Sequence, residues 1–135
     1  MPGGLRTEIH LGSDDTDGAF CLLLDFPPPG WSLPSHRHLG EIETIHILEG
    51  EFDMQVGARS MLATAGETVM VPKGVMHSGS NRTELPGRRI VIFSPGGMER
   101  FFLETGTATP DAEIDPQAAL AAANRHGWRF GDSAD

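Results

Sequence analysis

The feature that most constrains this chain is a set of potential metal ligands held at fixed spacings in two separate stretches. The first stretch contains His36, His38 and Glu43, and the second places His77 behind a Pro-Lys-Gly turn. Three imidazoles and one carboxylate form a ligand set that suits a transition metal and leaves coordination positions for water or substrate. The fold must bring two segments that are distant in sequence to one point, so the pattern predicts a metal site with open positions.

Short runs of strand-forming residues, separated by Gly, Pro and Asp, fill most of the chain up to residue 94. This spacing is typical of a β-sandwich or barrel. The predicted strands are Thr7–Leu11, Ala19–Phe26, Glu43–Leu48, Phe52–Val56, Ser60–Thr64, Thr68–Val71 and Arg89–Phe93. In a strand, His36 and His38 face the same side because they are two residues apart. Glu43 is an odd step beyond His38, so a turn or bulge at Leu39–Gly40 is needed to bring it inward.

After residue 94 the pattern changes from strands to helices. The run Gly97–Gly106 predicts one short helix, and Asp115–Gly127 predicts a second with Asp115 as its N-cap. We interpret Phe101 and Phe102 as residues that pack the first helix and do not contact a substrate.

Length and charge restrict the class of protein. At 135 residues the chain is long enough for one domain with a real core, and we divide it into an N-terminal arm and first strand (1–18), a barrel (19–94) and a helical tail (95–135). The net charge of −9 disfavours nucleic acid and anionic lipid as partners. The lone Cys21, the lack of an apolar segment that could span a membrane and the lack of an N-terminal signal segment lead us to expect a cytoplasmic protein.

The two stretches together resemble the two-motif signature of the cupin family. The signature glycines, prolines, ligands and asparagine all have a counterpart: Gly30, His36, His38, Glu43 and Gly50, then Gly66, Pro72, Gly74, His77 and Asn81. The resemblance implies a jelly-roll barrel, or double-stranded β-helix, in which His36, His38, Glu43 and His77 bind one divalent metal. The run Pro95–Phe102 is also similar to the tail of small actinobacterial cupins, some of them quercetinase-like.

Several reactions are compatible with such a centre. With Fe, Mn, Ni or Co, the metal can bring O₂ to a bound enolate or catecholate, and Glu43 can accept the substrate's hydroxyl proton as catalytic base. With Zn, the same ligands can serve an isomerase or a polyketide cyclase. A binding protein without turnover is the third possibility.

The apolar strand residues indicate what kind of ligand the barrel accepts. The predicted pocket residues are Phe52, Met54, Met61, Val69, Val71 and Phe93. They favour a small hydrophobic or aromatic ligand over a sugar phosphate. The run Ile90–Phe93 is apolar on both faces, and we expect a homodimer.

Overall fold

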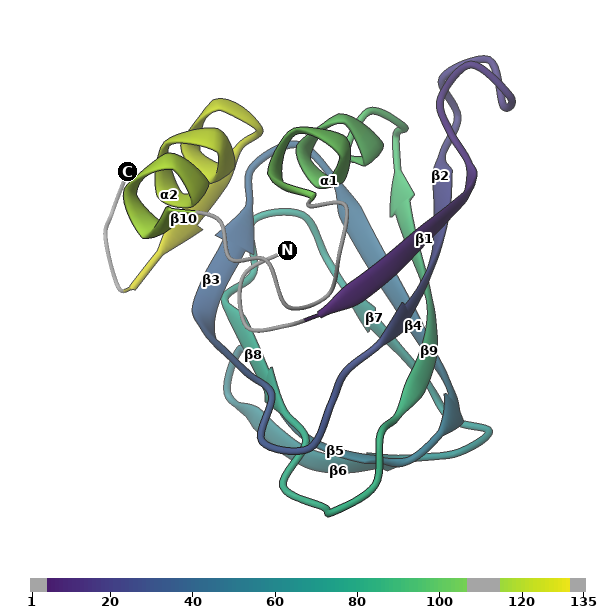
Figure 1. The fold of residues 1–135 in the computed structure, drawn as a ribbon, viewed down its shortest axis with the longest axis vertical. Helices are drawn as coiled ribbons and strands as arrows, with labels where there is room; N and C mark the ends of the chain where they lie inside the picture. The colour runs from purple at the N-terminus through teal and green to yellow at the C-terminus, as the bar shows by residue number, and fades with distance from the viewer. Residues whose placement is uncertain (1–4, 107–114, 132–135) are drawn as a thin grey trace.

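The computed structural model describes residues 5–106 and 115–131. In this part of the chain, two five-stranded antiparallel sheets face each other and form a barrel, and two helices lie together beside one end of it (Figure 1). The all-β class with a helical C-terminal tail, predicted from the sequence, is confirmed. No helix in the described ranges is long and apolar enough to cross a membrane.

The order of strands in each sheet brings together segments that are distant in sequence. One sheet has the order β1-β2-β9-β4-β7 and the other β10-β3-β8-β5-β6. The strands of the first sheet are β1 (Arg6–Leu11), β2 (Cys21–Phe26), β4 (Ile42–Glu49), β7 (Thr68–Val71) and β9 (Arg88–Ser94). Those of the second are β3 (Ser32–His38), β5 (Glu51–Val56), β6 (Arg59–Thr64), β8 (His77–Ser80) and β10 (Trp128–Phe130).

Alternating burial shows which residues point into the barrel. On β4, Glu43, Ile45 and Ile47 are buried and their neighbours are more exposed, the pattern of a strand with one face in the core. Phe52 and Phe93 are among the largest fully buried side chains. The interior therefore has apolar walls into which a few polar side chains project.

The helical tail contains two helices and one strand. Helix α1 (Glu99–Thr105) and helix α2 (Pro116–Arg125) were predicted, and Asp115 caps α2 by accepting a hydrogen bond from the backbone N–H of Ala118. Strand β10 was not among the predicted strands. It has only three residues and pairs with β3, so the end of the described chain becomes part of the barrel wall.

Candidate metal centre

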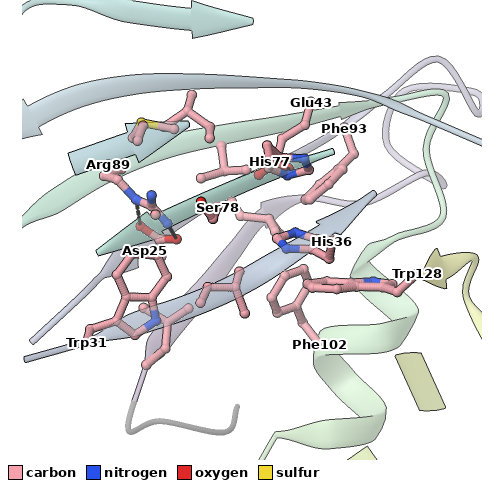
Figure 2. Close-up of a pocket in the computed structure, with 17 residues that line it drawn as sticks. Asp25, Trp31, His36, Glu43, His77, Ser78, Arg89, Phe93, Phe102 and Trp128 are labelled. Atoms are coloured by element: carbon pink, nitrogen blue, oxygen red, sulfur yellow. Dashed lines mark hydrogen bonds and ion pairs between the residues drawn. The ribbon is translucent and has the colours of Figure 1, made fainter. Parts of the chain in front are cut away.

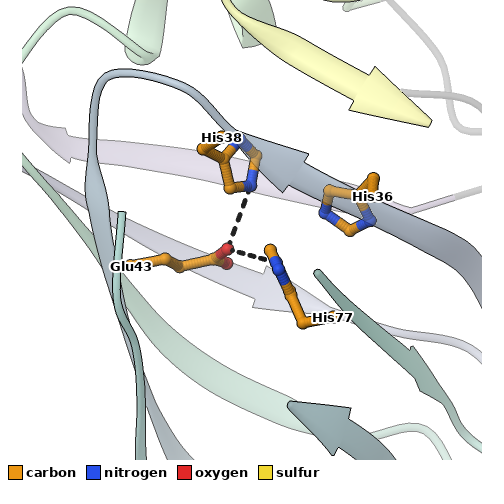
Figure 3. Close-up of side chains that lie close together, drawn as sticks. All are labelled: His36, His38, Glu43 and His77. Carbon is orange, nitrogen blue, oxygen red and sulfur yellow. Dashed lines mark hydrogen bonds and ion pairs between the residues drawn. The ribbon is translucent and has the colours of Figure 1, made fainter. Parts of the chain in front are cut away.

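The four predicted ligands come together inside the barrel from three strands. His36 and His38 lie on β3, His77 opens β8, and Glu43 projects from β4 in the facing sheet (Figure 3). All four are buried, and one ligand atom from each lies within 4.8 Å of the others. The protein thus has a cluster capable of binding a metal at the place where its two sheets approach each other.

Pairing and turns explain how residues so far apart in sequence meet. His36 stands directly opposite His77 in the β3–β8 ladder. The turn before His77 contains Gly74, which has a positive φ of 78° that favours glycine. The backbone N–H of Gly74 donates to the carbonyl of His38 over 2.8 Å, which ties this turn to the end of β3.

The distances between ligand atoms suit a single small cation. Glu43 Oε1 lies 3.0 Å from His77 Nε2 and 3.1 Å from His38 Nε2. Two ligands bonded to one ion at about 2.1 Å and at right angles would be about 3.0 Å apart. The carboxylate already has the separation from two imidazoles that a shared ion requires.

Two of the imidazoles are oriented by hydrogen bonds from the nitrogen that faces away from the cluster. His36 Nδ1 lies 2.8 Å from the carbonyl of Pro34, and His77 Nδ1 lies 3.1 Å from that of Val75. A carbonyl can only accept, so each Nδ1 carries a proton and donates it. In His36 this leaves the Nε2 lone pair available to a metal, whereas His77 Nε2 also lies in a hydrogen bond with Glu43 Oε1 that a metal would replace.

His38 has a different environment. It is 2% exposed, and neither of its ring nitrogens makes a hydrogen bond with the described residues. Its Nε2 is within ion-pair distance of Glu43 but is not aligned for a hydrogen bond. Buried polar atoms are nearly always satisfied, so an unsatisfied imidazole nitrogen at this point fits a bound metal.

Protonation also prepares the cluster for a cation. Burial, together with the charge of the neighbouring His77, lowers the pKa of His36 to about 3, so its ring is neutral. Burial alone would raise the pKa of Glu43, but contacts with His38 and His77 outweigh it and hold the pKa well below its usual value. Glu43 and His36 are therefore in the forms in which these side chains bind metals. Burial would lower the pKa of His77, but its contact with Glu43 outweighs burial and raises that pKa, so a metal would displace a proton from this ring.

A small cavity extends from the cluster along the barrel interior. Its volume is about 40 Å³, which holds a few water molecules. Trp128 and Phe102 lie beside His36 at one end, and Trp31 lies with Asp25 and Arg89 at the other (Figure 2). Bulky apolar side chains form most of the wall between these ends.

The predicted pocket residues occupy different places. Met54 and Phe93 line the cavity next to the cluster. Phe52, Val69 and Val71 are buried but do not line it. Met61 lines a separate open groove along β3, β5, β6 and β8.

Most of the residues that line the cavity were not predicted as site residues, among them Phe102, Trp128 and Arg89. Phe102 was interpreted as a residue that packs the helix and does not contact a substrate; it lines the cavity from α1, and whether it contacts a substrate stays a prediction. Trp128 and Arg89 were not considered as site residues. The alternating aromatic residues Trp128 and Phe130 after α2 could have indicated a short strand. The local sequence does not show that this strand pairs with β3, which carries His36 and His38.

Comparisons with known proteins identify the family. Residues 22–93 match the family described as the cupin domain, so the chain belongs to the cupins. The chain is 30% identical over 109 residues to quercetin 2,3-dioxygenase of Bacillus subtilis, a match that covers 78% of this chain and 31% of that enzyme. The chain therefore spans about a third of the length of its curated relative.

Solved structures show the same fold at low sequence identity. KdgF from Halomonas sp. has a TM-score of 0.65 at 17% identity, over 74% of this chain and 86% of that one. A predicted oxalate decarboxylase from Thermotoga maritima has a TM-score of 0.63 at 23% identity, over 67% and 80% of the two chains. The predicted double-stranded β-helix is confirmed.

Proposed function

We propose that this protein is a metal-dependent dioxygenase that acts on a small hydrophobic or phenolic molecule. The observation that carries the proposal is the cluster of His36, His38, Glu43 and His77 at the end of a cavity with aromatic walls. A similarity to quercetin 2,3-dioxygenase points to the same class of reaction. Fe, Mn, Ni or Co would suit this chemistry.

The residues of the site have separate tasks in this proposal. The three imidazoles and Glu43 would hold the ion, which supplies an open position for substrate oxygen and O₂. Glu43 is ionised, and its carboxylate is the group that would accept the hydroxyl proton of a phenol or enol. Phe93, Phe102 and Trp128 keep bulk water away and provide apolar contacts for an aromatic ring.

The size of the cavity limits what can bind without a change of shape. Pockets for drug-sized ligands have volumes of about 300–1,000 Å³, far larger than the 40 Å³ beside the cluster. A phenolic ring therefore needs a side chain of the wall to move. This observation favours, as a second candidate, a site that binds a ligand of only a few heavy atoms.

Metal analysis is the first test. We expect near-stoichiometric Fe, Mn, Ni or Co in the protein as purified and a fall of at least tenfold in His36→Ala and Glu43→Ala. His10→Ala is the matched control, because His10 is an exposed histidine that contacts Glu8 outside the cluster. Stoichiometric Zn would favour an isomerase or cyclase, and no metal after reconstitution would exclude the proposed reaction.

Oxygen consumption tests the reaction itself. The metal-loaded protein should consume O₂ in the presence of flavonols or simple catechols, and Glu43→Gln should lose most of that activity even where it retains metal. Metal binding without turnover of any phenol would leave the non-catalytic alternative as the better description.

We also propose that the protein forms a homodimer through the outer face of the sheet that contains β9. The pairing places Leu22 beside Ile92 and Leu24 beside Ile90 on this face, and Met70 lies two strands away and is 55% exposed. Contiguous apolar side chains on a sheet face are typical of an interface. Light scattering should show that Ile92→Arg dissociates the dimer, whereas Leu85→Arg, at a site 71% exposed, should not.

A further inference from the structure

Trp128 packs directly on two of the four predicted ligands. Its indole lies face to face with the ring of His36, with centroids 4.8 Å apart and planes 17° apart. It meets the ring of His38 edge to face, with centroids 4.5 Å apart and planes at 82°. Figure 2 shows the indole of Trp128 beside His36 at the end of the cavity.

The indole is itself held firmly. Trp128 stands opposite His38 in the β10–β3 ladder and is 2% exposed. Its Nε1 donates to Met98 Sδ over 3.1 Å, and the ring of Phe101 lies 4.7 Å from its own. The backbone N–H of Leu39 donates to the carbonyl of Gly127, which fixes the start of β10. The position of the indole is thus determined on several sides.

The three histidines of the cluster are oriented by different means. Backbone carbonyls hold Nδ1 of His36 and of His77, whereas Nδ1 of His38 makes no hydrogen bond with the described residues. Three rings pack edge to face against His38: those of Trp128, at 4.5 Å, His36, at 5.0 Å, and Phe93, at 5.2 Å. Packing replaces the usual hydrogen bond to the second nitrogen of a ligand.

We propose that Trp128 is a positioning residue of the metal centre, which orients the imidazole of His38 and supports that of His36 by aromatic packing. The C-terminal strand β10 is then a functional part of the site, although it contributes no ligand atom. This inference rests on the metal site of the proposed function but not on the reaction that the metal supports.

The test compares two buried tryptophans at opposite ends of one cavity. Trp128→Leu removes the ring next to the ligands and keeps an apolar side chain, and Trp128→Phe keeps a ring. Trp31→Leu is the matched control, because Trp31 is 4% exposed and lines the same cavity, but its ring contacts Phe52 and Arg89 and stacks on none of the described ligands. Affinity for Co²⁺ is measured by competition with a chelator, together with the visible absorption of the bound ion.

We expect Trp128→Leu to weaken Co²⁺ binding by about 10–100-fold and to change the Co²⁺ absorption bands, as loss of an orienting partner does. Trp128→Phe should keep the bands, and Trp31→Leu should stay within about twofold of the unaltered protein. Equal losses in Trp128→Leu and Trp31→Leu would overturn the proposal, since both would then reflect general stability. Unchanged binding in Trp128→Leu would overturn it as well.

Two further results separate this inference from the proposed function. If the unaltered protein binds Co²⁺ but consumes no O₂ with any phenol, the dioxygenase proposal fails and the role of Trp128 is still decided by the affinities. If the unaltered protein binds no metal, both fail. Should Trp128→Leu not fold by circular dichroism, Trp128→Met, which also lacks a ring, takes its place with the same expected loss.

Discussion

Two groups of buried polar side chains lie in the interior of this barrel. The side chains of one group pair with each other, whereas the other group leaves ring nitrogens without hydrogen bonds. At one end, Asp25 and Arg89 face each other across β2 and β9, and both are 5% exposed. Arg89 donates from Nε and Nη2 to the two carboxylate oxygens of Asp25 over 2.9 and 2.7 Å. At the other end, the metal-capable cluster has one carboxylate among three imidazoles and an unsatisfied His38.

The difference shows how a structural polar group can be told from a functional one. The Asp25–Arg89 pair is neutral as a unit, and the guanidinium also lies over the rings of Trp31 and Phe52. It needs no further partner. The cluster directs several lone pairs at a common point and leaves nitrogens without hydrogen bonds, which is costly unless a ligand supplies the missing interaction.

The largest expected effect on stability comes from breaking the Asp25–Arg89 ion pair. Asp25→Ala leaves a buried guanidinium without its partner and should lower the free energy of unfolding by about 3–5 kcal/mol. Chemical denaturation measures the loss. Asp53→Ala, which removes the exposed partner of Arg82, should barely change the unfolding midpoint.

A double variant sharpens this first prediction. Asp25→Leu with Arg89→Met replaces the pair with apolar side chains and should recover much of the stability that Asp25→Ala loses. If the single and double variants were equally unstable, the loss would come from packing and not from an unpaired charge.

Stabilisation of the protein by metal should depend on the metal-capable cluster and not on the Asp25–Arg89 pair. At a free metal concentration 100 times the dissociation constant, the unaltered protein should gain about 2.7 kcal/mol of stability. His36→Ala should lose this gain. Asp25→Asn should keep it despite a lower baseline, as measured by thermal unfolding with and without Co²⁺. If the metal-dependent gain in stability disappeared equally in both variants, the cluster and the Asp25–Arg89 pair would not be independent of each other.

Glu99 is a third buried carboxylate, and its substitution should give the smallest change in the free energy of unfolding. Burial raises the pKa of Glu99, but hydrogen bonds from Ser13 Oγ and from the backbone N–H groups of Ser13 and Gly97 outweigh it and lower the pKa to about 2. Glu99→Gln should cost about 1–3 kcal/mol at pH 7 because it weakens charge-assisted hydrogen bonds.

The pH dependence of this third effect has a defined sign. In the folded protein the Glu99 carboxyl stays ionised down to a pKa of about 2, whereas its ordinary value is 4.5. Between these values the unfolded chain binds more protons, so the stability due to Glu99 is complete above pH 4.5 and falls as the pH drops towards 2. Denaturation curves of Glu99→Gln and the unaltered protein should therefore converge in acid, and a constant difference would show that the carboxylate charge is unimportant.

The amino-acid sequence was sufficient to predict the four members of the cluster and the class of fold. His36 and His38 share a face because strand residues alternate, and the Pro-Lys-Gly turn before His77 is a local signal. The odd step from His38 to Glu43 required a change of direction, and the chain does leave one sheet after His38 and enter the other at Ile42. Such rules act over a few residues, so they can be read from the chain.

Only the tertiary structure decided the partners of those residues. Asp25 and Arg89 are 64 residues apart, and they pair because β2 and β9 are neighbours with that register. Trp128 meets His38 because a three-residue strand after α2 is added to the edge of the second sheet. The order of strands in a sheet depends on how all the apolar faces pack at once, so a local pattern in the sequence does not show which distant strands become neighbours. The ligands could therefore be predicted from the sequence, but the side chains that position them could not.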